Sequence, residues 1–504
     1  MKILLANPAI RVSIDDTHEK FFIKAGSRWP WTTIKRKQEK NCNIFFPFYL
    51  AYSANILRNK NHEVYVIDGV AMDMQEEEFI KRVKQIKPDV LVIETTTHAI
   101  SFDIELSKKI KIIFPKLKVV LTGPHATVFA QDILKENREI DFIIMGEYEF
   151  ILSEIVDRIK NKEKDFRVEG VAFQEQNGVW LSDKRGLIEN VNKLPFPAFD
   201  IFPCNDKSDL SIYRDGVCTY KPAVTLHSSR GCPFGCDFCL WTQVMYSDTR
   251  KYRMFEPKRV VDEMEYVIRE FGAKEIYFDD DDFCVNKKHV LNICQEIQAR
   301  NLNIKWSCMG DAMASDEEMI KTMAEAGCVF MKFGVESGNL EILKNIGKPL
   351  KPEKAIKTAE ICRKYGIYSH ATFTFGCKGE TIKTMQDTLN LANRIPFDSA
   401  QASITTPFPG TRYYNELVKN GQLKNIAWDQ FDGTQTCVIE TANLTSKQIE
   451  NFRKKAIKSM ILHKIIDPIW VYRNIRRNIL LLKNFGPQII LEPIKALYYT
   501  FIKK

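Results

Sequence analysis

Short apolar runs alternate with amphipathic segments over the first 160 residues. The candidate strands are mostly apolar and cover residues 3–6, 63–67, 89–93, 119–121 and 141–144. Between them, segments such as 51–61 and 102–114 repeat apolar residues at helical spacing. Strands that are apolar on both faces and separated by helices are typical of a parallel sheet covered on both sides. This region is therefore predicted to be a doubly wound, Rossmann-like α/β domain.

The same alternation resumes further along the chain and predicts a second α/β domain. Its candidate strands cover residues 223–227, 275–278, 304–308, 329–335, 369–375 and 400–405. Six β/α units suit a partial barrel, in which the active site lies at the carboxyl ends of the strands. Between the two regions, the segment LPFPAFDIFP is broken by prolines and reads as an extended connector. We expect domains at 1–160 and 216–420, joined by a connector at 161–215.

The remaining residues, 421–504, depart from this pattern and are predicted to be helical. From residue 446 onward, apolar and aromatic residues interleave with Lys and Arg, with prolines at 468, 487 and 493. A basic amphipathic helix that carries Trp and Tyr can lie in a membrane interface. The alternative is a helical cap packed across the barrel mouth with a solvated basic face. The two interpretations are compatible.

Charge and cysteine content limit which cellular compartment and which classes of binding partner are expected. Residues 451–504 hold twelve Lys or Arg and two acids, which leaves 61 basic and 62 acidic residues in the rest. A near-neutral body argues against nucleic-acid binding over a broad basic face. Thirteen cysteines without a regular framework favour reduced thiols. No apolar stretch has membrane-spanning length and the start lacks a secretory signal. We expect a cytoplasmic protein that touches the inner face of a membrane through its tail.

The most informative motif is the run Cys232-Pro-Phe-Gly-Cys236-Asp-Phe-Cys239, which follows the first strand of the second domain. Thiolates packed this closely on one loop bind a soft metal or an iron–sulfur cluster. Structural zinc takes four closed ligands, so three cysteines favour an iron cluster with one open iron. The alternative is a zinc knuckle completed by Cys218 or His227.

In its flanking sequence, HSSRGCPFGCDFCLW, this loop resembles the cluster loop of radical S-adenosylmethionine (SAM) enzymes. The segments FDDDDF, FGVESG, FTFGCKGET and PFPGT follow the later strands in the order of that family. Without that context, the four aspartates 279–282 read as a solvated loop, with magnesium as the alternative. The resemblance implies a [4Fe–4S] cluster whose open iron chelates SAM. The implied cluster ligands are Cys232, Cys236 and Cys239, and the implied SAM contacts are Phe238, Glu336, Ser337 and Gly376.

The first domain resembles the cobalamin-binding domain that precedes the barrel in one large class of radical SAM enzymes. The segments PFYLAYSANILRNKNHEVYVID, TGPHATVFAQDIL and DFIIMGEYEF carry this likeness. No Asp-x-His-x-x-Gly motif occurs, so no lower axial ligand of cobalamin is predicted. Glycines at strand ends allow the backbone to approach a large flat cofactor. The implied cobalamin contacts are Thr95, Thr96, Gly123, His125, Gly146 and Glu147.

Together these resemblances imply an enzyme that reductively cleaves SAM to a 5′-deoxyadenosyl radical. The radical abstracts hydrogen from an unactivated carbon, and methyl transfer from cobalamin is expected to follow. The basic tail favours a lipid or other membrane-borne substrate over another small molecule, and an external donor of the flavodoxin or ferredoxin type is expected. The alternatives are an oxidative cyclase or rearrangement enzyme with the same cofactors, and a non-catalytic cobalamin or redox sensor. A methylthiotransferase is excluded, because only Cys42 precedes residue 200.

Overall fold

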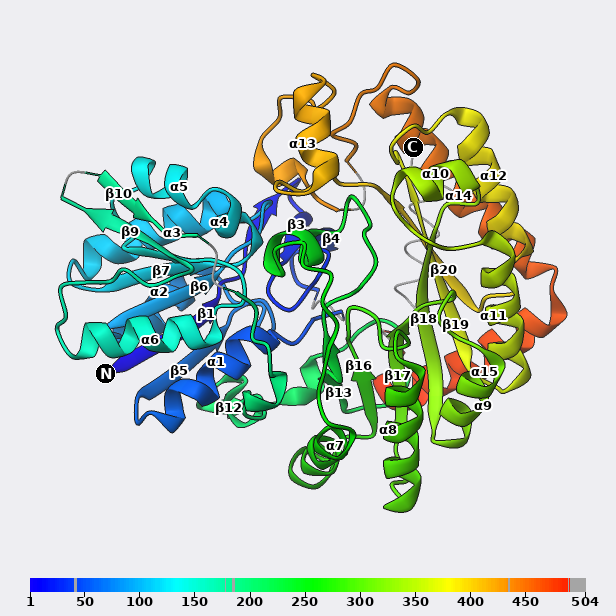
Figure 1. Cartoon of the computed structure of the whole chain (residues 1–504), viewed down its shortest axis with the longest axis horizontal. Coiled ribbons are helices and arrows are strands. Elements are labelled where there is room, and N and C mark those ends of the chain that lie inside the picture. The colour runs from blue at the N-terminus through cyan, green and yellow to red at the C-terminus, as the bar shows by residue number, and fades with distance from the viewer. Residues whose placement is uncertain (40–42, 177, 184–185, 434–435, 488, 490–504) are drawn as a thin grey trace.

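Two α/β bodies lie side by side, each built around one mainly parallel sheet (Figure 1). The structure is a computed structural model that describes residues 1–39, 43–176, 178–183, 186–433, 436–487 and 489. The first sheet has nine strands and the second has six. The predicted fold class, a Rossmann-like domain followed by a partial barrel and C-terminal helices, is confirmed.

Five parallel strands form the centre of the first sheet, in the order β8-β7-β6-β1-β5. They are β1 (Lys2–Asn7), β5 (Glu63–Asp68), β6 (Val90–Glu94), β7 (Lys118–Thr122) and β8 (Phe142–Ile144). Helices α1 (Phe48–Asn59) and α6 (Glu149–Lys160) cover one face, and α2 (Glu76–Ile86), α3 (Ile100–Ile113) and α5 (Ala130–Glu136) cover the other. The short helix α4 (Pro124–Val128) follows β7. The strand order reverses between β1 and β6, where open α/β sheets bind ligands at their carboxyl edge.

The connector contributes to the first sheet instead of acting as a plain spacer. Strands β9 (Val171–Glu175) and β10 (Gly178–Leu181) extend one edge in antiparallel pairing. Strands β11 (Pro203–Cys204) and β12 (Lys207–Ser208) extend the other edge. Three short 3-10 turns at 191–193, 199–201 and 210–212 complete the passage to the barrel.

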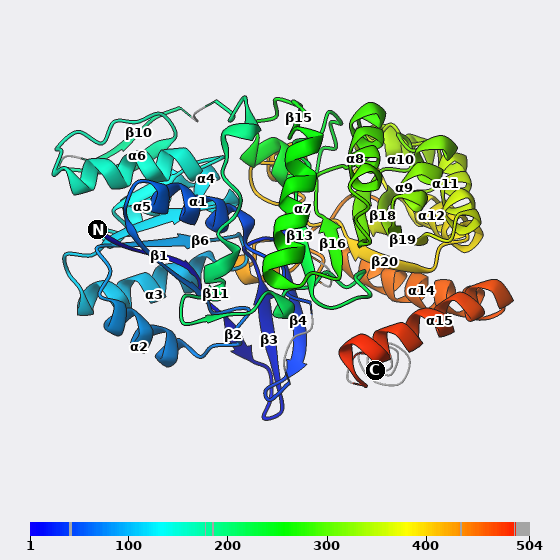
Figure 2. The same ribbon diagram turned by 90° about the horizontal axis from the view of Figure 1, so that it is seen from below.

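A three-stranded insertion between β1 and α1 was not predicted from the sequence. Strands β2 (Arg11–Ser13), β3 (His18–Ile23) and β4 (Trp31–Arg36) form an antiparallel sheet that projects between the two bodies (Figure 2). Directly after β3, the fully buried Lys24 places its Nζ 2.6 Å from Asp103 Oδ1 on α3. Its charge also acts on Glu94 and Asp68, at the ends of β6 and β5. The insertion therefore occupies the crevice side of the first sheet.

The second sheet is an open barrel of six parallel strands in sequence order. The strands are β13 (Ala223–Leu226), β16 (Glu275–Phe278), β17 (Lys305–Gly310), β18 (Cys328–Glu336), β19 (Tyr368–Phe375) and β20 (Ser399–Ile404). The helices between and after them are α7 (Pro257–Phe271), α8 (Lys287–Ala299), α9 (Glu317–Glu325), α10 (Leu340–Asn345), α11 (Pro352–Lys364), α12 (Ile382–Arg394) and α13 (Arg412–Lys419). A short two-stranded ribbon pairs β14 (Ser229–Arg230) with β15 (Arg253–Met254).

Two long helices end the described chain, and the second of them lies away from the barrel mouth. Helix α14 (Ser446–Ile465) packs on α12 and β20, and α15 (Pro468–Phe485) lies below the barrel strands (Figure 2). On α15, Arg473 binds Asp398, which directly precedes β20, and Arg477 donates to the carbonyls of Gly216 and Val217 ahead of β13. These anchors lie at the amino ends of the strands, so the alternative of a cap across the mouth is wrong for α15. The first turns of α14 do pack at the carboxyl end of β19, where the rings of Phe375 and Phe452 lie 5.3 Å apart.

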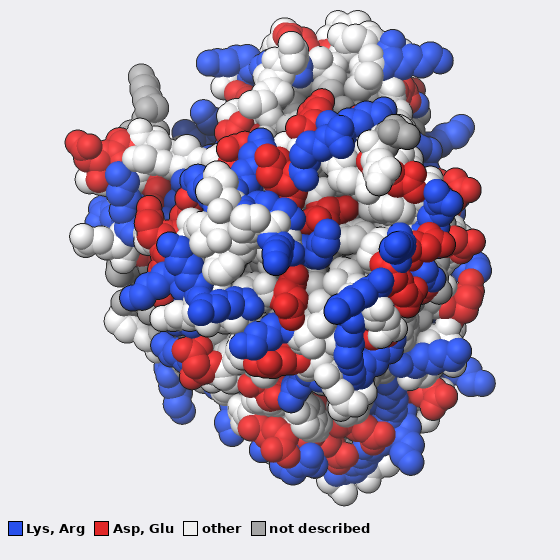
Figure 3. Space-filling view, turned by 90° about the vertical axis from the view of Figure 1, so that its left-hand side faces the viewer, with Lys and Arg blue, Asp and Glu red and all other residues white. Residues whose placement is uncertain are grey.

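No described helix is long and apolar enough to cross a bilayer. The part of the tail prediction that covers residues 490–504 lies outside the described residues. On the side of the molecule formed by the first domain, basic and acidic side chains are interspersed (Figure 3). That mixture agrees with the near-neutral charge of the body.

The buried Lys24–Asp103 pair yields a stability prediction. Lys24→Met should lower the free energy of unfolding by about 3–5 kcal/mol, because it leaves the Asp103 carboxylate buried without its cation. The double variant Lys24→Met/Asp103→Leu should recover most of that loss, because both charges are then absent. Denaturant titration followed by circular dichroism measures both. Equal destabilisation by the single and double variants would contradict the ion-pair account.

Candidate functional site

The cysteine loop leaves the carboxyl end of β13 and is braced by the aspartates that follow β16. Asp280 accepts hydrogen bonds from Ser228 N (2.8 Å), Ser228 Oγ (2.6 Å) and Ser229 Oγ (2.5 Å). Asp281 accepts from the backbone N–H of Gly231 at 2.8 Å, one residue before Cys232. Asp279, Asp280 and Asp282 are buried, so the interpretation of this run as a solvated loop is wrong. The aspartates hold the loop instead.

Glycines let other segments approach the loop closely. Gly231 has φ +92°, and a Cβ there would lie 2.0 Å from the Lys251 carbonyl oxygen. Gly347, with φ +70°, similarly leaves room for the Gly235 carbonyl at 2.4 Å from its virtual Cβ. The N–H of Asp237 donates to the Ile346 carbonyl at 2.9 Å. The turn after α10 is therefore docked directly on the loop between the first two cysteines.

The three loop cysteines are each partly exposed, unlike the other described cysteines, which are buried. Burial raises the pKa of the Cys236 thiol to about 12, although the nearby Lys348 ammonium opposes that shift. Burial likewise raises the thiol pKa of Cys232 and Cys239. Thiolates at these positions therefore need a compensating positive centre. Three soft donors on one braced, accessible loop fit an iron–sulfur cluster.

A site for a single metal ion needs donor atoms that converge on one point. Among the described residues, no group of three or more His, Cys, Asp or Glu is placed in this way. Cys218 and His227, the residues considered as a fourth zinc ligand, are both buried. The His227 ring packs 3.9 Å from the Phe48 ring, measured between centroids.

The residues implied in SAM binding fall into two pairs. Phe238 lies on the cysteine loop, half-buried, and Glu336 ends β18 with a left-handed φ of +65°. The Glu336 carboxylate lies 3.3 Å from Lys348 Nζ, and burial raises its pKa. By contrast, the Ser337 hydroxyl hydrogen-bonds Thr388, and the Gly376 N–H donates to Glu380 at 2.6 Å. Phe238 and Glu336 thus place an aromatic ring and a carboxylate near the cysteine loop, while Ser337 and Gly376 form hydrogen bonds to Thr388 and Glu380.

The residues implied in cobalamin binding lie along the carboxyl edge of the first sheet. Thr95 and Thr96 follow β6 and are fully buried. Gly123, with φ +100°, would place a Cβ 2.3 Å from the Thr95 carbonyl oxygen, so it keeps two strand ends together. His125 is covered by Trp428 from the C-terminal region, with ring centroids 5.0 Å apart. A side chain at Gly146 would touch the Met245 carbonyl at 3.4 Å, so this edge faces the segment after the cysteine loop.

Buried ion pairs join this edge directly to the cysteine loop. Glu147 binds Arg253 through two contacts of 2.6 and 3.0 Å and lies 3.3 Å from Arg230. Glu149 lies 2.7 Å from Arg230, whose guanidinium also stacks on Tyr49 at 4.7 Å. The Glu147 carboxylate, implied as a cobalamin contact, is thus used in a contact between domains. Sequence reasoning missed both arginines: Arg230 had the signal of a position two residues before Cys232, and Arg253 had no local signal.

Polar side chains line the concave face of the barrel sheet. On β18 and β19, half-buried residues alternate with residues buried beneath the helices. The half-buried positions pair across strands in rows: Lys332 with His370 and His370 with Ser399, then Thr372 with Gln401. Lys332 Nζ lies 3.7 Å from an Asp215 carboxylate oxygen. Burial lowers the pKa of His370 to about 3, so its ring is neutral at physiological pH.

The insertion of the first domain forms a roof over the barrel mouth, which the sequence did not reveal. Arg28 binds both the carboxylate and the backbone carbonyl of Asp279. Trp29 lies edge-on to Phe238, with centroids 6.2 Å apart, and edge-on to Phe408 at 5.1 Å. Its indole N–H donates to the Gly433 carbonyl at 2.7 Å. The insertion therefore links the cysteine loop to the C-terminal region.

The bracing role of Asp280 can be tested by iron loading. Asp280→Ala should lower iron and sulfide content after anaerobic reconstitution several-fold, because the N–H and two hydroxyls that fix the loop lose their acceptor. Asp280→Asn, which keeps one acceptor oxygen, should retain more iron. The exposed Asp132→Ala on α5 is the matched control. Full iron loading of the folded Asp280→Ala protein would contradict the bracing role.

Comparison with known proteins agrees with this geometry. Residues 226–392 match the model of the radical SAM superfamily, and residues 43–156 match that of the B12 binding domain. The chain is 32% identical over 416 residues to the uncharacterized methyltransferase PH0819 of Pyrococcus horikoshii, covering 82% of this chain and 88% of that one. It is 26% identical to the anaerobic magnesium-protoporphyrin IX monomethyl ester cyclase of Cereibacter sphaeroides, covering 83% and 68%.

Among solved structures, the fold is similar to that of the radical SAM methyltransferase TsrM from Kitasatospora setae, determined with cobalamin and a [4Fe–4S] cluster. The TM-score is 0.66 at 17% identity, covering 93% of this chain and 89% of that one. The two matched domains occur here in the order and orientation that bring their strand ends together. The chain belongs to the cobalamin-dependent enzymes of the radical SAM superfamily.

Proposed function

We propose that this enzyme transfers a methyl group to an unactivated carbon, using a [4Fe–4S] cluster on Cys232, Cys236 and Cys239 together with cobalamin and SAM. When bound, these groups would transfer to SAM the electron that cleaves it, provide the 5′-deoxyadenosyl radical that abstracts hydrogen, and carry the methyl group. An external donor of the flavodoxin or ferredoxin type supplies the electron. The observation that carries the proposal is the buried Arg230 link between the cysteine loop and the end of β8.

That link matters because hydrogen abstraction and methyl delivery must act on one carbon. Arg230 lies two residues before Cys232 and binds Glu147 and Glu149 of the first domain. The two cofactor regions are thus fixed relative to each other by short contacts with little freedom. Positioned reactants of this kind gain much of their rate from orientation alone. A non-catalytic sensor would not need a cysteine loop held at this precision.

The chain's own residues prepare the site in three ways. The thiolates of the three cysteines hold the cluster, and Lys348 balances negative charge near Cys236. Glu336, held by Lys348, offers a carboxylate to the amino or ribose groups of SAM. The roof formed by Arg28 and Trp29 excludes water from the mouth, which protects a reactive radical.

The comparison with named relatives leaves one alternative. The Cereibacter sphaeroides relative is a cyclase, whereas the more similar Pyrococcus horikoshii relative is named a methyltransferase. The Pyrococcus horikoshii relative has the higher identity and is matched over more of its own length, 88% against 68%, which favours methyl transfer over oxidative cyclisation. S-adenosylhomocysteine, formed only when SAM gives up its methyl group, discriminates between the two.

The polar concave face supports a substrate whose reacting part is polar. Lys332, His370 and Gln401 have the partners Asp215, Ser399 and Ser403, and a hydrocarbon placed against them would take their remaining hydrogen-bonding capacity out of water, which is costly. The tail favoured a lipid or membrane-borne substrate, but α15 lies at the base of the barrel and lines no part of the mouth. We therefore propose that a polar small molecule, or the polar headgroup of a lipid, enters the barrel.

The cluster assignment predicts a selective loss on substitution. After anaerobic reconstitution with iron, sulfide and cobalamin, Cys236→Ala should lose iron and form at least a hundredfold less 5′-deoxyadenosine, because three thiolates are needed to hold the cluster. The matched control Cys204→Ala replaces a buried cysteine at the edge of the first sheet and should retain both. Chromatography of 5′-deoxyadenosine and S-adenosylhomocysteine gives the readout. Zinc bound in place of iron would refute the assignment.

The polar face predicts a different phenotype for Lys332→Met. Its 5′-deoxyadenosine formation without substrate should stay within about twofold of wild type, because the cysteine loop is untouched. Deuterated product formed from methyl-deuterated SAM in a metabolite extract should fall about tenfold or more, since one charged hydrogen bond is lost. Mass spectrometry provides the measurement, with the exposed Lys344→Met on α10 as control. Undiminished product formation would place the substrate elsewhere.

A further inference from the structure

The outward side of α15 carries an apolar stripe. Its members recur every three or four residues, which places them on one helix face. Their exposed fractions are large: Ile469 52%, Tyr472 65%, Ile475 56%, Ile479 60% and Leu482 39%. The stripe continues onto the end of α14 through Leu462, Ile465 and Ile466, exposed by 59%, 54% and 76%. We call these eight residues the base face.

The inward side of α15 fixes this orientation. Arg473 binds Asp398, the indole N–H of Trp470 donates to the Asp398 carbonyl at 2.9 Å, and Arg477 donates to two carbonyls ahead of β13. The Tyr368 hydroxyl donates to the Arg473 carbonyl at 3.3 Å. Because these polar contacts hold the helix against the amino ends of the barrel strands, the base face cannot turn inward. An apolar stripe of this length on a solvent face indicates a binding surface.

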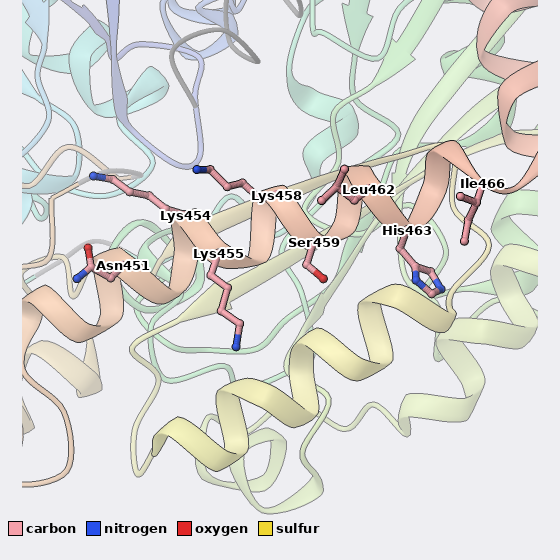
Figure 4. A pocket seen from close by; sticks show the side chains of 8 residues that line it. All are labelled: Asn451, Lys454, Lys455, Lys458, Ser459, Leu462, His463 and Ile466. Atoms are coloured by element: carbon pink, nitrogen blue, oxygen red, sulfur yellow. The ribbon is translucent and has the colours of Figure 1, made fainter. Parts of the chain in front are cut away.

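The charge around the base face has one sign. Arg476 and Lys483 are exposed on α15, which contains no acidic residue. The capping Asp467 is already paired with Arg363 at 3.0 Å. A shallow groove of about 660 Å³ runs along α14 and is lined by Lys454 and Lys455 as well as by Leu462 and Ile466 of the base face (Figure 4). Basic and apolar residues therefore form one continuous surface.

We propose that the base face docks on a bilayer that contains anionic lipids. Apolar side chains with Tyr enter the interfacial region, while surrounding Lys and Arg attract the anionic headgroups. A second copy of the chain is the wrong complement, because it would bring two basic surfaces together. Docked in this way, the enzyme holds the amino ends of its barrel strands toward the membrane and its mouth away from it. This inference does not rest on the proposed reaction.

Vesicle co-sedimentation of the full chain tests the proposal. Wild type should sediment with vesicles of phosphatidylcholine and phosphatidylglycerol in equal parts, and much less with phosphatidylcholine alone. Arg476→Gln/Lys483→Gln should lower the partition coefficient about tenfold or more, because each basic residue near an anionic bilayer contributes to the binding free energy and two of them are removed. Ile475→Gln/Ile479→Gln should lower it to a similar extent by removing inserted apolar area.

Matched controls separate this surface from general effects of charge and exposure. Ile112→Gln replaces an isoleucine that is 81% exposed on α3, and Lys135→Gln/Lys419→Gln removes two exposed lysines from α5 and α13. Both controls should sediment as wild type does, and all variants should keep the wild-type melting temperature. No binding of wild type to anionic vesicles would overturn the proposal, and so would binding that both α15 variants retain. A wild-type dimer that the α15 variants abolish, without vesicle binding, would assign the base face to a second copy instead.

Discussion

The buried charge cluster at the domain boundary is the constraint on which the site depends. Two carboxylates of the first domain, Glu147 and Glu149, meet two guanidinium groups of the second, Arg230 and Arg253. Taking four charges out of water costs several kcal/mol for each, and only close pairing of all four offsets that cost. The cluster therefore restricts the two domains to a narrow range of relative placements. Its contribution is specificity of arrangement more than stability.

That placement sets what the cysteine loop can do. Arg230 fixes the strand that enters the loop, Asp280 and Asp281 fix the backbone between, and the turn at Gly347 fixes the far side. The loop is thus held from the first domain, from the neighbouring barrel strand and from the turn after α10. Three separate supports are consistent with a site that must keep a bound group in one position relative to another domain.

The sequence predicted the strands well and the contacts between them poorly. All eleven predicted strands occur, because each is an apolar run bounded by clear helical periodicity. The insertion at β2 to β4 escaped, since its strands mix apolar with charged residues instead of forming apolar runs. The aspartates 279–282 were misread for another reason: their partners lie 50 to 52 residues away on the cysteine loop and, for Arg28, 251 residues away, and no local pattern encodes that proximity. Of the candidate site, the cysteines were evident and the residues that position them were not.

The position of the C-terminal helices shows that membrane contact and a lipid substrate, which their composition suggested together, are separate questions. A basic, apolar tail suggested both membrane contact and a lipid substrate, but these require different surfaces. Helix α15 lies at the amino ends of the barrel strands, whereas the cysteine loop leaves the carboxyl end of β13. Contact with a bilayer at the base therefore cannot feed hydrocarbon directly into the mouth. A membrane-borne substrate would have to present its polar part to the opposite end of the barrel, and a freely diffusing polar substrate meets no such requirement.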